Sequence, residues 1–266
     1  MLSLSYSRVP EGRALGQAIL HIHTTYSDGL ATVDEILDEV ERNSEVDVVG
    51  FTDHDDVRAY RRALRWKAAH PNSRVQPLWG VELTVWGFKH LLIYQFKPPF
   101  PRTSFPKFLP LDKAVRAAKA AGGVVIVPHV DVFWIGMGRH RLARVARKHG
   151  IDGIELLTPF QGSERSVGNL TKMNDQHGLL AVGGSDAHHI EDLYRVIVEF
   201  PGRTTEDLGR AFGQQTVRPR WGPSARPVPL GRRLRQQTRA LVQHPYEQLQ
   251  TWARRCAERS TFNVQR

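Results

Sequence analysis

Histidine and acidic residues recur in this sequence directly after short apolar runs. The run AIL at residues 18–20 leads into His21 and His23, and Asp28 follows five residues later. Imidazole and carboxylate groups are common ligands of transition-metal ions in proteins. Two histidines that are two residues apart on a strand point to the same face, so both could reach one ion. The stretch HIHTTYSDG at residues 21–29 therefore predicts one part of a metal site.

Other apolar runs end in the same kinds of residue. They supply Asp53, His54, Glu82, His129, Asp186 and His188. One histidine at the end of a strand is more often a hydrogen-bonded core residue than a ligand, so the prediction depends on the whole set. Burying this many imidazoles and carboxylates together would carry a large electrostatic cost unless they shared a partner. We therefore predict a metal centre built from residues that are remote in sequence.

Short apolar runs predict the strands that position these residues, and helix-like segments lie between them. The runs cover residues 18–23, 47–54, 76–85, 89–96, 124–130, 153–158, 179–187 and 195–200. Most are apolar almost without interruption, which is typical of parallel strands buried on both faces. About seven β-α units favour an α/β fold with a closed, TIM-like barrel, and an open doubly wound sheet is the alternative. In such a barrel the strand ends meet at one mouth, where the candidate ligands would gather.

Composition excludes several classes of protein. With 266 residues and 41% hydrophobic content, the chain can bury a sizeable core. Its one cysteine, Cys256, excludes an internal disulfide framework and a cysteine-based zinc cluster, and fits a reducing compartment. We find neither the pattern of a signal peptide nor an apolar stretch long enough to cross a bilayer. These features predict a cytoplasmic protein without a transmembrane segment.

The positive charge of the chain is concentrated near its C-terminus. Of the net charge of +10, residues 201–266 carry +9, from 13 arginines and four acidic residues, so the first 200 residues are nearly neutral. The stretch RPRWGPSARPVP at residues 218–229 is too rich in proline for an ordinary helix or central strand. We therefore predict a catalytic domain over residues 1–217, a linker over 218–229 and an Arg-rich helical extension over 230–266.

The extension has the pattern of two helices, one from residue 230 and one with Pro245 in its first turn. The second contains an apolar stripe, with Tyr246, Leu249, Trp252, Ala253 and Cys256 spaced three and four residues apart. This stripe predicts docking on the barrel or on a second subunit. The alternative is recruitment of a polyanion such as RNA, or of anionic lipid, by the Arg-rich face.

Several short motifs together resemble one known family. HIHTTYSDG, TDHD at 52–55, GVEL at 80–83, PHV at 128–130 and GSDAH at 184–188 occur in the order found in the PHP family. This is the polymerase and histidinol phosphatase superfamily of metal-dependent phosphoesterases. The resemblance extends from residue 18 to about residue 217.

The resemblance implies a distorted seven-stranded, TIM-like (β/α)7 barrel that binds two or three divalent ions of manganese, iron or zinc. It assigns the metal ligands to His21, His23, Asp28, His54, Glu82, His90, His129, Asp186 and His188. Asp53 would orient a neighbouring ligand and contribute to catalysis in that way. Relatives that act on nucleotides have an inserted lid domain, whereas only 46 residues separate Glu82 from His129 here.

The ligand types indicate the chemistry. Imidazole-rich sites suit manganese, iron or zinc better than magnesium or calcium. Two ions bridged by Glu82 would activate a hydroxide nucleophile and clamp the phosphoryl oxygens. His189 is the candidate general acid, with His140 and Arg139 as weaker ones, and Arg165 could hold a phosphate. A solvated surface residue is the alternative interpretation for each of these four.

These observations predict a metal-dependent phosphoesterase, and more specifically a phosphomonoesterase. Without a lid its mouth would be open, with specificity set by the loop 97–110 and the segment 131–140. Trp66, Trp79 and Trp86 would pack in the core or line the rim, and would stack on a base only if they flank the mouth. The predicted partner is a phosphorylated small molecule, with nucleic acid as a possible partner of the Arg-rich tail. The alternatives are a nuclease acting on RNA or DNA ends, hydrolysis of a non-phosphate bond, and a non-catalytic PHP interaction module.

Overall fold

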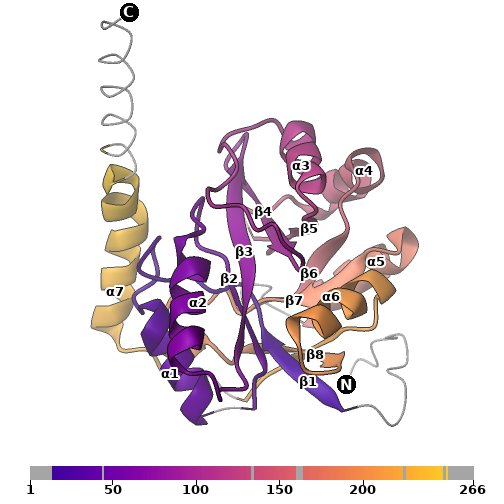
Figure 1. The fold of residues 1–266 in the computed structure, drawn as a ribbon. Coiled ribbons are helices and arrows are strands. Elements are labelled where there is room, and N and C mark those ends of the chain that lie inside the picture. Colours follow the sequence, from indigo (N-terminus) through magenta and orange to yellow (C-terminus); the bar gives the residue numbers. More distant parts are fainter. Residues whose placement is uncertain are drawn as a thin grey trace, which may run out of the picture.

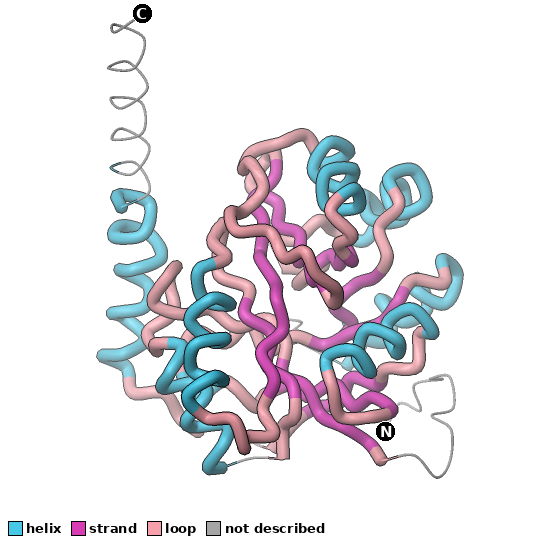
Figure 2. Tube along the Cα trace, viewed as in Figure 1, coloured by secondary structure: helices cyan, strands magenta, loops and turns pink. Residues whose placement is uncertain are grey.

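The strands of the protein form one curved sheet with helices on its outside (Figure 1, Figure 2). The structure is a computed structural model that describes residues 14–43, 45–132, 135–159, 164–223, 226–247 and 250. Within these ranges nine strands follow the order β7-β6-β5-β4-β3-β2-β1-β8-β9 across the sheet. They are β1 Leu15–Ile19, β2 Val48–Phe51, β3 Gln76–Val85, β4 Lys89–Gln95, β5 Val124–Val127, β6 Gly153–Leu157, β7 Leu180–Gly183, β8 Val196–Pro201 and β9 Arg218–Trp221.

The sheet mixes parallel and antiparallel strands, which corrects part of the sequence prediction. β1, β2 and β3 are parallel to one another, as are β5, β6 and β7. β4 is antiparallel to both of its neighbours, and β8 is antiparallel to β1. The reason at β4 is the turn before it: Val85 pairs with Lys89, and the residues between them are too few for a crossover. Consequently the first residues of β4 lie beside the last residues of β3, at the same end of the barrel.

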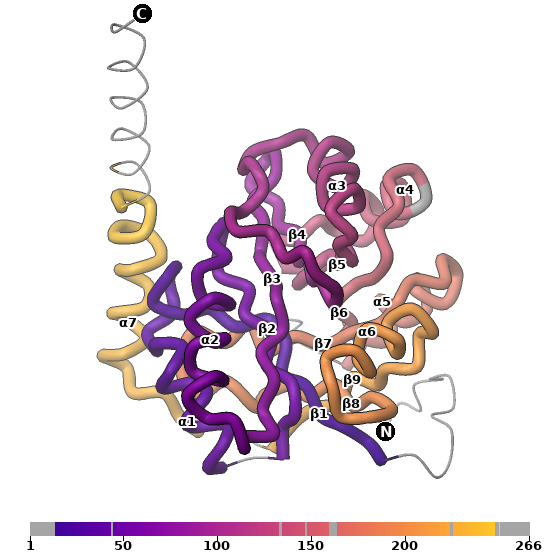
Figure 3. The backbone as a smooth tube through the Cα atoms, viewed as in Figure 1, coloured from indigo at the N-terminus to yellow at the C-terminus, as the bar shows by residue number. Residues whose placement is uncertain are grey.

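Hydrogen bonds beyond the ends of β1 and β7 close the barrel at its mouth. The Ser185 N–H donates to the Leu20 carbonyl over 3.1 Å, and the Ala187 N–H donates to the His21 carbonyl over 3.1 Å. The His23 N–H returns a bond of 2.9 Å to the Ala187 carbonyl. The early strands thus lie beside the late ones (Figure 3). A nearly closed barrel, and not an open doubly wound sheet, is therefore the arrangement of this chain.

Side chains alternate between the interior of the barrel and the helix layer. Val48 and Leu92 pack in the same cluster inside the barrel, whereas the next residue of each strand, Val49 or Ile93, packs against the surrounding helices. All four are fully buried. Burial on both faces explains the near-continuous apolar runs, because each face of the strand has its own core.

The helices cover the outside of the barrel, and α1 and α6 begin with side-chain caps. They are α1 Val33–Asn43, α2 Arg58–Ala69, α3 Leu111–Ala120, α4 Arg139–His149, α5 Glu164–His177, α6 Thr205–Gln214 and α7 Leu230–Thr238. Before α1, the Glu35 N–H donates to Thr32 Oγ1 over 3.3 Å and the Thr32 N–H donates to Glu35 Oε2 over 2.8 Å. Such a reciprocal pair satisfies two backbone donors at the start of a helix. No described helix is both long and apolar enough to span a membrane.

The C-terminal part departs from the prediction in two places. Residues 218–221 of the predicted linker form β9, which lies at the edge of the sheet, a position that tolerates Pro219. The predicted break between two helices is absent from the described part of the extension. α7 continues through the π-helical turn η2, Arg239–Gln243, into helical residues 244–247. This wider turn precedes Pro245, which has no N–H to donate.

The predicted apolar stripe lies largely outside the described residues. The residues of the stripe that lie outside the described part are Leu249, Trp252, Ala253 and Cys256. Tyr246 is described and is exposed. Docking of this stripe therefore stays a prediction.

Candidate metal centre

Five histidines surround the carboxylate of Glu82 at the mouth of the barrel. Glu82 Oε2 lies 3.1 Å from His21 Nε2, 3.2 Å from His23 Nε2 and 3.4 Å from His54 Nδ1. Its other oxygen, Oε1, lies 2.9 Å from His90 Nδ1 and 2.9 Å from His129 Nε2. Glu82 itself is almost completely buried. One side chain of β3 is thus the meeting point of residues from four other segments.

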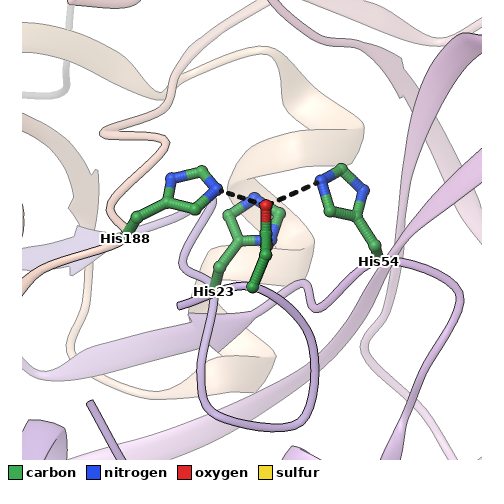
Figure 4. A group of neighbouring side chains, drawn as sticks. His23, His54 and His188 are labelled. Atoms are coloured by element: carbon green, nitrogen blue, oxygen red, sulfur yellow. Dashed lines mark hydrogen bonds and ion pairs between the residues drawn. The ribbon is translucent and has the colours of Figure 1, made fainter. Parts of the chain in front are cut away.

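Two aspartates complete the set on either side of His23. Asp186 Oδ1 lies 3.2 Å from His23 Nε2 and 3.3 Å from His21 Nε2. Asp28 Oδ2 lies 3.2 Å from His188 Nε2 and 3.8 Å from His54 Nε2. Figure 4 shows His54 and His188 pointing at this carboxylate from opposite sides, with His23 between them. The structure thus brings all nine predicted ligands together.

These residues form overlapping groups with the spacing of metal ligands. Within the described residues, three groups offer ligand atoms that lie within 4.8 Å of one another. The groups are His23, Asp28, His54 and His188; His21, His23, Glu82 and Asp186; and His54, Glu82 and His90. His129 is outside these groups but contacts Glu82. Because Glu82, His23 and His54 each belong to two groups, adjacent ions would share ligands.

Unused buried nitrogens show that the site fits metal ions. Both ring nitrogens of His23 are buried and accept or donate no hydrogen bond within the described protein. The same holds for His129 Nδ1 and for Asp28 Oδ1. Buried polar atoms nearly always have a partner, so these atoms fit a ligand role. A set rich in imidazole favours manganese, iron or zinc over ions that prefer all-oxygen ligands.

Three of the predicted ligands have a strained backbone. His21, His129 and Asp186 have positive φ angles of 64°, 31° and 46°. Each follows the end of a strand, β1, β5 or β7, where the chain leaves the extended conformation. Such a conformation costs a residue other than glycine about 1–3 kcal/mol and persists only where the surroundings enforce it. The bonds that close the barrel at residues 185–187 supply part of that enforcement.

Comparison with known families agrees with this geometry. A PHP domain model matches residues 20–158, and a PHP-associated model matches residues 172–217. The chain belongs to the PHP family. The sequence-based identification is thereby confirmed, and so is the TIM-like barrel of PHP type. A search of the curated proteins found no match.

Solved structures with the same fold have differing descriptions. A two-domain protein from Bacteroides vulgatus, described as containing a predicted PHP-like metal-dependent phosphoesterase, aligns with a TM-score of 0.60 and 16% identity over 84% of this chain and 70% of that one. An amidohydrolase from Chromobacterium violaceum, with bound sulfate and no metal, aligns at 0.54 and 19% over 76% and 97%. A lesion-specific endonuclease from Pyrococcus furiosus aligns at 0.56 and 17% over 76% and 56%. At these identities the likeness concerns the fold.

Glu155 is a residue of the PHP centre that the sequence analysis missed. This fully buried side chain of β6 accepts a hydrogen bond from the His129 N–H over 2.9 Å, and its other oxygen lies 2.8 Å from His21 Nδ1. It therefore holds one ligand by its ring and another by its backbone, as carboxylates often do beside metal-bound histidines. The only signal in the sequence is a glutamate inside the apolar run GIELL.

The structure places His90 at the mouth of the barrel, although His90 lies at the start of its apolar run and not at the end. It is the second residue of β4 and pairs with Thr84 near the end of β3. Because β4 runs antiparallel to β3, its beginning lies at the mouth. The fourth apolar run thus contributes a ligand from its start.

Asp53 supports the loop that carries Asp28. It accepts hydrogen bonds from the Thr24 N–H over 2.8 Å and from Ser27 Oγ over 2.6 Å, and the Thr24 hydroxyl donates to both of its oxygens. Burial raises the pKa of the Asp53 carboxyl, and the bonds from Ser27 and Thr24 act in the opposite direction. The side chain therefore holds the loop and belongs to none of the three metal-ligand groups.

The candidate general acids lie outside the cluster. His189 Nδ1 lies 3.1 Å from Asp192 Oδ2, so its ring is held by the short 3-10 helix η1, Ile190–Asp192. Arg139 Nε donates to Asp131 Oδ1 over 2.9 Å at the start of α4. His140 and Arg165 are exposed on α4 and α5. Phe133 and Trp134, in the predicted mouth segment 131–140, lie outside the described residues.

Electrostatics divide the imidazoles into charged and neutral groups. Burial disfavours the charged form of His23, but Asp186, Glu82 and Asp28 outweigh it and raise its pKa to about 10. Burial lowers the pKa of His54 to about 3 despite Glu82 and Asp28 nearby. The pKa of Glu82 is well below its usual value, because His90, His54 and His21 overcome the effect of burial. A metal ion would therefore compete with protons at His23 and find His54 already neutral.

Proposed function

We propose that this PHP protein hydrolyses phosphoesters, preferentially small phosphomonoesters, with two or three manganese, iron or zinc ions. The observation that carries the proposal is the arrangement of five imidazoles around Glu82, flanked by Asp28 and Asp186. Ions bound there supply Lewis acidity and lower the pKa of water, which is the chemistry that phosphoester hydrolysis needs.

The residues of the chain have separate tasks in this proposal. Glu82 belongs to two ligand groups, so its two oxygens would keep neighbouring ions close together. Glu155 holds the ring of His21 and the backbone of His129, which keeps two of the strained ligands in place. Asp53 fixes the turn before Asp28. A preorganised centre of this kind needs little rearrangement when charge develops on the substrate.

The described surface around the mouth supports small substrates. Between Glu82 and His129 the chain forms the end of β3, then β4, a loop, α3 and β5, without an inserted domain. The loop 97–110 lies beside the end of β3, where the Phe108 N–H donates to the Thr84 carbonyl over 2.8 Å. Trp86 lies in the adjoining turn and is 69% exposed, so it is free to contact a leaving group.

A nuclease is the second candidate function. One structural neighbour is an endonuclease, and the arginines Arg233 and Arg235 are exposed on α7. We rank it below the phosphomonoesterase because no array of exposed aromatic residues accompanies these arginines on α7 within its described residues, where the exposed apolar side chains are aliphatic. Hydrolysis of a non-phosphate bond is a third outcome, given the amidohydrolase neighbour.

The test combines elemental analysis with a substrate panel. Purified protein is analysed for bound manganese, iron and zinc, then assayed on aryl phosphates, sugar phosphates, nucleotides, oligonucleotides and amides, before and after chelation. We expect chelator-sensitive release of phosphate from simple monoesters. Exclusive cleavage of oligonucleotides would favour the nuclease, and full activity of a metal-free sample would refute both.

A further inference from the structure

The C-terminal helix contacts two of the three loops that supply ligands to one metal group. In η2, Arg239 Nε donates to the Ser27 carbonyl over 2.9 Å, and Arg239 Nη2 donates to the Thr25 carbonyl over 2.8 Å. In α7, Arg232 pairs with Glu191. Ser27 precedes Asp28, and Glu191 lies three residues after His188. Arg232 and Arg239 are seven residues apart, so they lie on the same side of the helix.

The two loops are already joined to each other, which makes them one unit for the helix to hold. The Leu30 N–H donates to the His188 carbonyl over 2.9 Å. Asp28 Oδ2 lies 3.2 Å from His188 Nε2. Both residues belong to the group formed with His23 and His54.

The Asp28 loop depends on contacts from outside the sheet. After His23 the chain leaves the barrel wall, and Asp53 holds it from within through Thr24 and Ser27. On the other side, the carbonyls of Thr25 and Ser27 are bound by Arg239. The guanidinium is planar and donates in two directions, so one side chain fixes two points of the turn.

The helix that makes these contacts lies beyond both matched family models, which end at residues 158 and 217. We propose that α7 and η2 form a strut for this metal group, in which Arg239 positions Asp28 and Arg232 positions the His188 loop. The extension is then part of the metal centre. The inference relies on the metal binding of the proposed function, and its test does not require hydrolysis.

Two variants and a control on the same helix test the strut in the full-length chain. Arg239→Ala removes both bonds to the loop, and Arg239→Lys keeps the charge but not the planar fork. Arg235→Ala is the control, because Arg235 is exposed one turn earlier and its side chain forms no hydrogen bond or ion pair with the described residues. Metal-free protein is titrated with Mn²⁺, and hydrogen exchange of the backbone amides of residues 24–30 is followed in the metal-free state.

We expect Arg239→Ala to weaken at least one class of bound Mn²⁺ by about 10- to 100-fold, as loss of an outer partner of a metal ligand usually does. Hydrogen exchange in residues 24–30 should become faster in Arg239→Ala, and the rate in Arg239→Lys should lie between those of Arg239→Ala and the wild type. Unchanged exchange in β3 would show that the variants remain folded. Wild-type Mn²⁺ affinity and loop exchange in Arg239→Ala would refute the strut. So would an equal loss in Arg235→Ala.

The same experiment separates this inference from the proposed function. If the wild type binds Mn²⁺ but hydrolyses no phosphoester, the proposed function fails, and the affinity difference between Arg239→Ala and Arg235→Ala still tests the strut. If phosphoesters are hydrolysed and the variants bind metal equally, the strut fails alone.

Discussion

Gly184→Ala should damage the metal centre without replacing a ligand. A methyl group at position 184 would lie 2.6 Å from Cδ of Glu155, closer still to its Oε1, and 2.9 Å from Cβ of His21. Side-chain carbons almost never approach so closely, so Glu155 would have to move. Its carboxylate would then lose its contact with His21 Nδ1 and its bond from the His129 N–H.

The expected magnitude follows from these contacts. Overpacking a well-packed interior costs about 1–3 kcal/mol, and a lost hydrogen bond to a charged group costs about 1.5–3 kcal/mol. Overpacking and the loss of one such bond together lower the free energy of unfolding by roughly 2.5–6 kcal/mol, compared with a total of about 5–15 kcal/mol for an ordinary domain. Because Glu155 holds two ligands, the affinity for Mn²⁺ should fall by about 10- to 100-fold.

The assay is urea unfolding together with Mn²⁺ titration of the metal-free protein. Gly213→Ala is the matched control, since no atom lies within 4 Å of the methyl group that it adds. Gly213 lies in α6, so this control should be neutral or more stable by up to about 1 kcal/mol. A Gly184→Ala protein with the unfolding free energy and the Mn²⁺ affinity of wild type would refute the role assigned to Glu155.

Three further predictions concern the same centre. Glu82→Gln should lose most bound metal and all hydrolysis while remaining folded, because Glu82 contacts five imidazoles. Elemental analysis measures the metal and circular dichroism the fold, and a variant that keeps its full metal content would contradict the prediction. Mn²⁺ affinity should rise with pH between about 6.5 and about 10, because the ion must displace the proton of His23. The raised pKa of His23 stabilises the metal-free fold below pH 6.5, and this stabilisation is lost as the pH approaches 10. Each displaced proton makes binding about tenfold tighter per pH unit, and a flat profile in chelator competition would exclude this competition. Trp86→Ala should raise KM for aryl phosphates by about 2- to 10-fold and leave methyl phosphate unaffected; an equal change for both substrates would mean that Trp86 does not contact the leaving group.

Local pattern was sufficient to find most of the ligands. His21, His23 and Asp186 lie at or just beyond the ends of apolar runs, Glu82 lies near the end of one, and a barrel brings strand ends together whatever the detailed topology. The resemblance to PHP motifs then added His90, whose place at the start of a run did not fit a set of parallel strands. Its position became clear only with the direction of β4, which the short turn after Val85 sets.

The types of the residues and their order along the chain are properties of the sequence by itself. They determined the barrel class, the family, and a metal centre rich in histidine and carboxylate, because residue type and strand periodicity are local. Only the tertiary structure decided which residues support that centre. Glu155 lies inside a strand, and Arg239 lies more than two hundred residues from the loop that it holds. Arg239 has no local signal and Glu155 only that of one acidic residue in an apolar run, since the function of each depends on the atom that the fold places beside it.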